Sequence, residues 1–104
     1  MREHATEDDM LAARAADFKA LMDEHRAALA ALPGVDPLPA LPTAAQLQRC
    51  DAQHVERRRQ LMVLCTNYQR RSREIVALHQ AEEDDLRERT HAAVKSPPVM
   101  AAHA

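Results

Sequence analysis

Three side chains of the metal-binding kind could meet in one layer between two helices. Cys50 and His54 are four residues apart, which places a thiol and an imidazole on the same face of a helix. The antiparallel pairing predicted below sets His25 opposite both. Thiolate and imidazole are typical zinc ligands, so this layer is a candidate metal site. The alternative, which we favour, is that Cys50 packs as a small hydrophobe and the histidines form a polar layer, so that no metal and no cofactor is expected.

Two arginine clusters could contact the phosphates of a nucleic acid. They consist of Arg57, Arg58 and Arg59, and of Arg70, Arg71 and Arg73. No aromatic residues alternate with these arginines, and the net formal charge of the chain is -2. We therefore favour helix faces that are solvated or paired within the chain, and nucleic-acid binding is the less favoured interpretation.

The sequence lacks the motifs on which catalysis commonly depends. Its 104 residues include a single glycine, and there is no glycine-rich phosphate loop, no His-Glu-x-x-His pair and no nucleophile elbow. We predict that the chain is not an enzyme.

Two helices would position the residues named above. The first is predicted over residues 6–32, where Thr6 caps an acidic first turn and apolar residues recur every three or four positions. Residues 33–42 contain four prolines and cannot continue a helix. A second helix over 43–91 opens with a Thr43-x-x-Gln46 capping box, and a flexible tail is expected over 92–104. The predicted fold is a single all-α domain, an antiparallel, coiled-coil-like helical hairpin with a long second helix and a proline-rich connector.

The register of this hairpin is predicted by matching the two apolar seams. Pairing Leu32 with Leu47 across the connector sets His25 against His54. The first helix then ends opposite Ser72, and the hairpin leaves the apolar side of the second helix beyond it uncovered. That side could take a second copy of the hairpin, fold back against the N-terminus or dock a segment of another protein. The residues predicted to bind a partner there are Tyr68, Arg70, Arg71, Arg73, Ile75, Val76, Leu78, His79 and Leu86.

Composition predicts the cellular location of the chain and its need for a partner. No run approaches the roughly 18 apolar residues of a membrane span, and the acidic first residues do not fit a signal peptide. Cys50 and Cys65 are too far apart on one helix to bridge each other and are expected to be reduced. We predict a cytoplasmic protein with no membrane partner. One Phe, one Tyr and no Trp make a thin core, which favours a protein client or a second copy in a homodimer.

Residues 64–81 resemble the last long helix of flagellar export chaperones of the FlgN type. In that family a Cys or small residue is followed by a polar turn, an Asn-Gly pair, two aliphatic residues and a Gln. Cys65, Ile75, Val76 and Gln80 fit this pattern, whereas Ser72-Arg73 stands where the Asn-Gly pair is expected. The resemblance implies a chaperone that covers the amphipathic segment of a flagellar or type III export substrate.

The sequence thus leaves three functions open. The favoured one is a non-enzymatic helical protein-binding module that acts as a cytoplasmic export chaperone by helix-in-groove binding. The alternatives are a self-associating structural coiled-coil protein and, less favoured, a regulator that binds nucleic acid through its arginine clusters.

Overall fold

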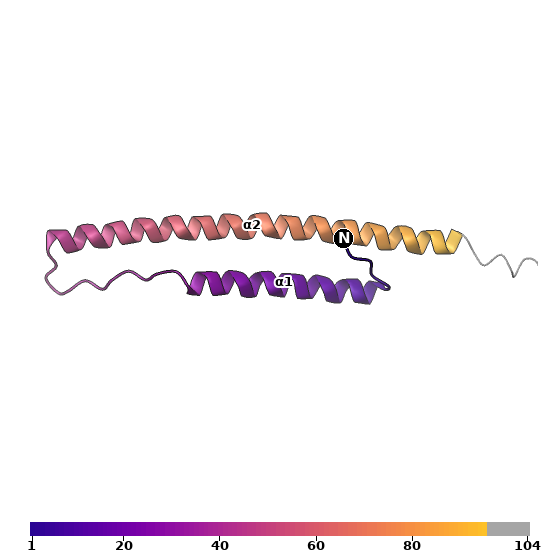
Figure 1. Ribbon diagram of the computed structural model, residues 1–104, viewed down its shortest axis with the longest axis horizontal. Coiled ribbons are helices and arrows are strands. Elements are labelled where there is room, and N and C mark those ends of the chain that lie inside the picture. The colour runs from indigo at the N-terminus through magenta and orange to yellow at the C-terminus, as the bar shows by residue number, and fades with distance from the viewer. Residues whose placement is uncertain (96–104) are drawn as a thin grey trace, which may run out of the picture. The chain divides into compact units, whose positions relative to one another are not determined.

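The computed structural model describes residues 1–95 of the chain. These residues form two α-helices, α1 (Glu7–Ala30) and α2 (Ala44–Lys95), and no strand (Figure 1). The predicted fold class, an all-α antiparallel helical hairpin, is confirmed. Helix α2 continues beyond His91, where the predicted tail begins, and the rest of that tail, 96–104, lies outside the described residues. Neither helix contains, in the described part, a stretch apolar and long enough to span a membrane.

Both helices begin at the caps that the sequence predicts. The Thr6 Oγ1 accepts a hydrogen bond from the backbone N–H of Asp9 at 3.1 Å. At the start of α2 the backbone N–H of Thr43 donates to Gln46 Oε1 at 2.8 Å, and that of Gln46 donates to Thr43 Oγ1 at 3.1 Å. These bonds satisfy amide groups that have no partner within the first turn of a helix. The two caps therefore fix where each helix can begin.

The segment between the helices is bound along the first turns of α2. The backbone N–H of Asp36 donates to Gln53 Oε1 at 3.0 Å, and Gln53 Nε2 donates back to Asp36 Oδ2 at 2.8 Å. Arg57 donates to the Pro33 carbonyl oxygen at 2.6 Å. The connector therefore packs on a part of α2 that α1 would contact if the loop between the helices were short.

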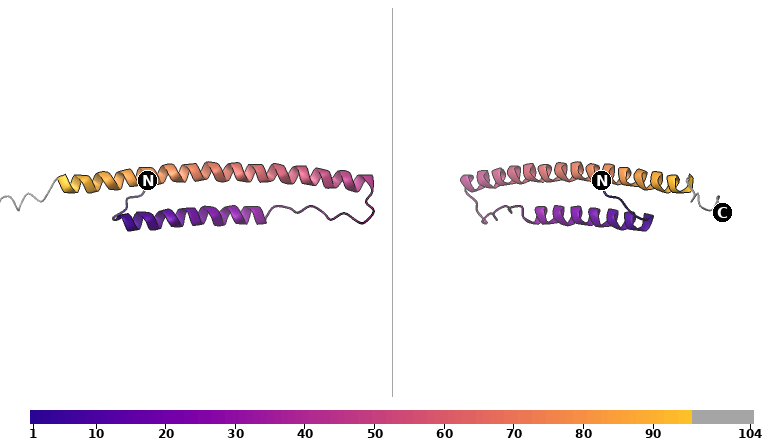
Figure 2. Two further views of the ribbon diagram at one scale, coloured as in Figure 1. Left: turned by 180° about the vertical axis from the view of Figure 1, so that it is seen from behind. Right: turned by 45° about the vertical axis from the view of Figure 1, so that its right-hand side comes forward.

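The chain divides into two compact units, each of which pairs a segment of α1 with an antiparallel segment of α2. Unit 1 joins Met1–Lys19 to the part of α2 from Arg73 onward, and unit 2 comprises Ala20–Ser72. Within unit 1 the residues before α1 turn back along α2, as both views in Figure 2 show. Unit 1 thus packs three segments, and unit 2 packs two helix segments and the connector.

The register predicted from the apolar seams is wrong. In unit 2 the ring of His25 lies against Tyr68, with centroids 4.5 Å apart, and not against His54. Tyr68 is fourteen positions, or two heptads, further along the chain than His54. A shift by whole heptads keeps the same seam positions in contact, so the apolar pattern alone does not distinguish the two registers. Within unit 2 the connector is bound at Gln53 and Arg57, on the part of α2 that the predicted register assigns to α1.

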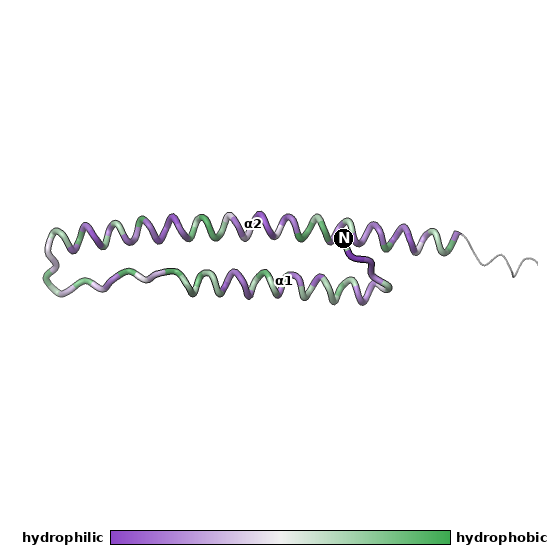
Figure 3. The backbone as a smooth tube through the Cα atoms, in the orientation of Figure 1, coloured by the Kyte–Doolittle hydropathy of each residue, from purple (hydrophilic) through white to green (hydrophobic). Residues whose placement is uncertain are grey.

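The seam between the helices is unusually polar. In α2 the half-buried and buried residues include Cys50, Gln53, Arg57, Leu64, Tyr68, Arg71, Ile75, His79, Glu82, Leu86 and Arg89. Figure 3 shows hydrophilic residues interrupting the apolar ones along both helices. Among residues 1–95 the buried hydrophobic side chains are Met10 in unit 1 and Leu21 in unit 2. Apolar burial is therefore small, and much of the pairing within each unit depends on polar contacts.

Candidate functional site

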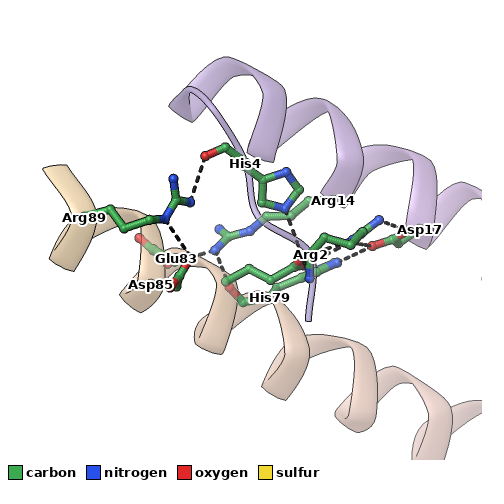
Figure 4. A network of polar contacts seen from close by, with 9 residues as sticks. Arg2, His4, Arg14, Asp17, His79, Glu83, Asp85 and Arg89 are labelled. Carbon is green, nitrogen blue, oxygen red and sulfur yellow. Dashed lines mark hydrogen bonds and ion pairs between the residues drawn. The ribbon is translucent and has the colours of Figure 1, made fainter.

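Arg2 lies at the centre of a cluster of charged side chains in unit 1 (Figure 4). Its Nε and Nη2 donate to Glu82 Oε2 and Oε1 at 3.0 and 2.9 Å, and its backbone N–H also donates to Oε2 at 3.2 Å. On the other side Nη1 and Nη2 donate to Asp17 Oδ1 and Oδ2 at 3.2 and 2.5 Å. One guanidinium therefore bridges a carboxylate of α1 and a carboxylate of α2 by a two-pronged contact to each.

Two histidines complete the cluster. His4 Nε2 lies 3.0 Å from Glu82 Oε2, and His79 Nε2 lies 2.7 Å from Asp17 Oδ2. The ring of His79 also meets Phe18 edge to face, with centroids 5.2 Å apart. The exposed fractions are 8% for His4, 4% for His79 and 1% for Glu82. We call His4, Asp17, His79 and Glu82 the polar cluster.

Two further arginines hold the surroundings of the polar cluster in place. Arg14 Nη2 donates to the backbone carbonyl oxygen of His79 at 3.0 Å and to Glu83 Oε2 at 2.9 Å. Arg89 Nη2 donates to the backbone carbonyl oxygen of His4 at 2.8 Å, while its Nε donates to Asp85 at 2.9 Å. These contacts, visible in Figure 4, fix both the N-terminal segment and α2 beside the cluster.

The arginine keeps both carboxylates of the cluster ionised. The hydrogen bonds from Arg2 lower the pKa of Glu82 to about 2, against burial, which raises it, and the contact with His4 lowers it further. Arg2 and then His79 lower the pKa of Asp17 in the same way. The two carboxylates in turn raise the pKa of Arg2. The polar cluster thus carries two negative charges and two imidazoles, and Arg2 adds one guanidinium beside it.

Helix geometry explains how the cluster assembles. His79 and Glu82 are three residues apart in α2, and Arg14 and Asp17 are three apart in α1, so each pair lies on one helix face. The Thr6 cap ends the N-terminal segment at the start of α1. The few residues before it are then long enough to bring Arg2 and His4 back to α2.

The structure does not bring together the three metal candidates predicted from sequence. His25 lies against Tyr68, Cys50 is half-buried, and His54 is exposed. In residues 1–95 the ligand-type group found instead is that of Asp17, His79 and Glu82, whose ligand atoms all lie within 4.8 Å of one another.

The predicted partner-binding residues lie on several different faces. Ile75, His79 and Leu86 are half-buried or buried within unit 1, so the expectation that this apolar side is uncovered is wrong. Val76 and Leu78 are 54% and 37% exposed. These five residues therefore do not form one open surface.

The remaining predicted residues are divided in a similar way. Tyr68 packs on His25, and Arg71 Nη1 pairs with Glu24 Oε1 at 2.5 Å within unit 2. Arg70 and Arg73 are exposed, and Arg70 Nη2 donates to Asn67 Oδ1 at 2.6 Å.

An open apolar face of α2 does exist in unit 2, and its residues were not predicted apart from Arg70. A shallow groove there is lined by Arg59, Met62, Val63, Thr66, Asn67 and Arg70, which we call the outer face. Met62 and Val63 are 66% and 59% exposed. Two large apolar side chains at its centre are thus flanked by an arginine on either side.

Sequence reasoning missed most of the polar cluster as well. Arg2 and His4 precede the first predicted helix, and nothing local links them to residues almost eighty positions away. One signal was present, namely a carboxylate at Glu82 three positions after His79 of the predicted seam. The acidic run 82–85 is typical of a solvated face, and that interpretation is wrong for Glu82, which is 1% exposed. A carboxylate that is buried between two helices needs a positively charged partner nearby. An arginine elsewhere in the chain is the partner to look for.

No family model, no curated protein and no solved structure matches the chain.

Proposed function

We propose that the chain is a helical protein-binding module whose outer face binds an amphipathic, acidic helix of another protein. The supporting observation is the exposure of Met62 and Val63 between Arg59 and Arg70 on a rigid helix. Large apolar side chains that stand together in a groove with a polar rim are typical of a protein interface.

The spacing of the outer face suits a helical partner. Arg59, Met62, Val63, Thr66 and Arg70 recur at three- and four-residue steps, so they follow one side of α2. Eleven residues separate the two arginines, which corresponds to roughly 16 Å along the helix axis. A partner helix of about three turns can therefore cover Met62 and Val63 and place one carboxylate near each arginine.

Charge favours a different protein over a second copy of this chain. Residues 56–71 contain five arginines and one acidic residue, Glu56, which pairs with Arg59 at 2.6 Å, so the formal charge of this stretch is +4. In a symmetric antiparallel contact centred on the outer face, Arg59 of one copy would meet Arg70 of the other. Like charges across an interface oppose association, whereas an acidic partner is attracted.

The narrower function is that of an export chaperone for a flagellar or type III substrate. It rests on the resemblance of residues 64–81 to chaperones of the FlgN type, a stretch that includes Thr66, Asn67 and Arg70 of the outer face. Covering an amphipathic segment until hand-over calls for moderate, reversible affinity. A shallow groove with few apolar anchors suits that requirement.

A synthetic peptide tests the binding mode without a known client. We would titrate the full chain into a fluorescein-labelled 18-residue helix with a Leu/Ile stripe and Glu on its flanks, and read fluorescence anisotropy. Binding should weaken by at least about tenfold in Met62→Asp, because the substitution places a charge in the apolar contact. Gln48→Asp, exposed on the same helix outside the groove, should leave the affinity unchanged.

Two results would contradict the proposal. One is equal affinity for a peptide with Lys in place of Glu, and the other is no difference between Met62→Asp and Gln48→Asp. Light scattering across a dilution series measures self-association. A dimer that Met62→Asp dissociates would show that a second copy covers the outer face, in favour of the self-associating alternative.

A further inference from the structure

The polar cluster of unit 1 has the composition of a transition-metal site. Its four members offer two imidazole nitrogens and two carboxylates, and they come from three separate segments of the chain. The ligand atoms of Asp17, His79 and Glu82 lie within 4.8 Å of one another, and His4 Nε2 lies 3.0 Å from Glu82 Oε2. Three potential ligands therefore converge within unit 1, and His4 lies beside one of them, Glu82, without any change in the helix pairing of unit 1.

We propose that the polar cluster binds Zn²⁺ and that Arg2 is a displaceable cation in the position that the metal would take. Asp17, His79 and Glu82 offer one imidazole and two carboxylates, a set of three ligands that zinc accepts in tetrahedral geometry with a fourth ligand from water or from His4 after a small movement. At metal–ligand distances of about 2.1 Å, neighbouring ligand atoms of a tetrahedron stand roughly 3.4 Å apart. The observed His79–Asp17 and His4–Glu82 separations of 2.7 and 3.0 Å need to lengthen only slightly.

Burial and charge favour a divalent ion over the arginine. Asp17 and Glu82 bring two negative charges to a site where Glu82 is 1% exposed, and Arg2 returns one positive charge. Zn²⁺ balances both carboxylates and forms a coordinate bond with an imidazole lone pair, to which a guanidinium can only donate a hydrogen bond. The imidazoles also exclude the purely oxygen-liganded sites that Ca²⁺ and Mg²⁺ prefer.

Arg2 is able to leave without disrupting the helices. It precedes α1, its side chain is 45% exposed, and the backbone of the next residues is held separately by Arg89 on the His4 carbonyl oxygen. His79 and Glu82, by contrast, are three positions apart on one face of α2 and are preset by the helix. A solvent-accessible cation above fixed ligands is what exchange with a metal requires, and the exchange breaks the hydrogen bonds of Arg2 to Asp17 and Glu82.

Cobalt is the spectroscopic probe that tests this site. The metal-free full chain would be titrated with Co²⁺ and read by visible absorption, followed by displacement with Zn²⁺. We expect one Co²⁺ with the strong absorption of a four-coordinate ion, and at least about tenfold weaker binding in His79→Ala and in Glu82→Gln. His54→Ala removes an exposed imidazole in unit 2 and should not change the affinity.

Arg2→Met separates this proposal from weak binding by scattered histidines. If Arg2 competes with the metal, its removal should strengthen Co²⁺ binding by about tenfold or more, and Zn²⁺ should restore the urea midpoint that the variant loses. Arg2→Lys, which retains the charge but not the two-pronged contact, keeps the comparison open if Arg2→Met does not fold; it should also bind more tightly than the wild type. Unchanged or weaker binding in the arginine variants, or equal losses in His54→Ala and His79→Ala, would overturn the proposal.

Discussion

Unit 1 and unit 2 use the same two helices in opposite ways. In unit 1 the contact face of α2 buries His79 and Glu82, and an N-terminal segment supplies the cation that they need. In unit 2 the contact face rests on Leu21 and on the stacking of His25 with Tyr68, while Met62 and Val63 stay on the outside. Unit 1 therefore buries polar side chains, whereas unit 2 exposes apolar ones. The difference teaches that partner binding is to be sought in unit 2 and chemistry that depends on charge in unit 1.

Arg2→Met should produce the largest effect in this comparison. It leaves Glu82 buried without its main cation, and we expect a loss of about 3 kcal/mol in the free energy of unfolding in metal-free buffer. Hydrogen exchange should show the loss in residues 73–95 and not in 44–72. The double variant with Glu82→Met should recover most of it, because both charges are then gone. Equal exchange in the two stretches would mean that they unfold together.

Acid should weaken the same unit. The pKa of Glu82 is about 2 in the folded chain, against an ordinary value of 4.5, so the unfolded state binds more protons between those values. Its contribution to stability is complete above about pH 4.5 and is lost as the pH falls towards about 2. The urea midpoint followed between these limits should fall more steeply in the wild type than in Glu82→Gln. Parallel slopes would contradict the assignment.

Leu21→Ala tests the apolar side of the comparison. Leu21 is 2% exposed, and its truncation should cost about 2 kcal/mol, the low end for core leucines, because so thin a core can collapse around the cavity. We expect the loss to appear in the urea midpoint and in hydrogen exchange of 44–72. Leu11→Ala, at 48% exposure, is the matched control and should change stability little. A smaller change in the urea midpoint than in Leu11→Ala would show that burial of Leu21 does not stabilise unit 2.

Glu24→Gln should give the smallest effect. The ion pair of Glu24 with Arg71 is the counterpart in unit 2 of the contacts of Arg2, but Glu24 is 60% exposed. Exposed pairs contribute about 0 to 1 kcal/mol, so the urea midpoint should hardly move. A loss as large as that of Arg2→Met would show that burial does not separate the two units.

The sequence predicted the local features well and the register badly. Both caps, the fold class and the presence of His79 on the seam followed from residues within a few positions of one another. The pairing of His25 with Tyr68 did not follow, because the apolar repeat is equally satisfied by registers one or two heptads apart. The polar cluster was beyond reach for another reason: His4 and Glu82 are 78 positions apart, and no local pattern connects them. The outer face was missed because the uncovered surface was derived from the wrong register.

The contact of Arg2 with Glu82 also sets an order in time. Residues near the start of the chain are synthesised first, yet their partner lies 80 positions later. At about 5–20 residues per second, Arg2 waits roughly 4 to 16 s before Glu82 exists. During that interval the only structure open to the N-terminal segment is local, and α1 lacks most of α2. The contact that closes unit 1 can therefore form only after residue 82 has been synthesised.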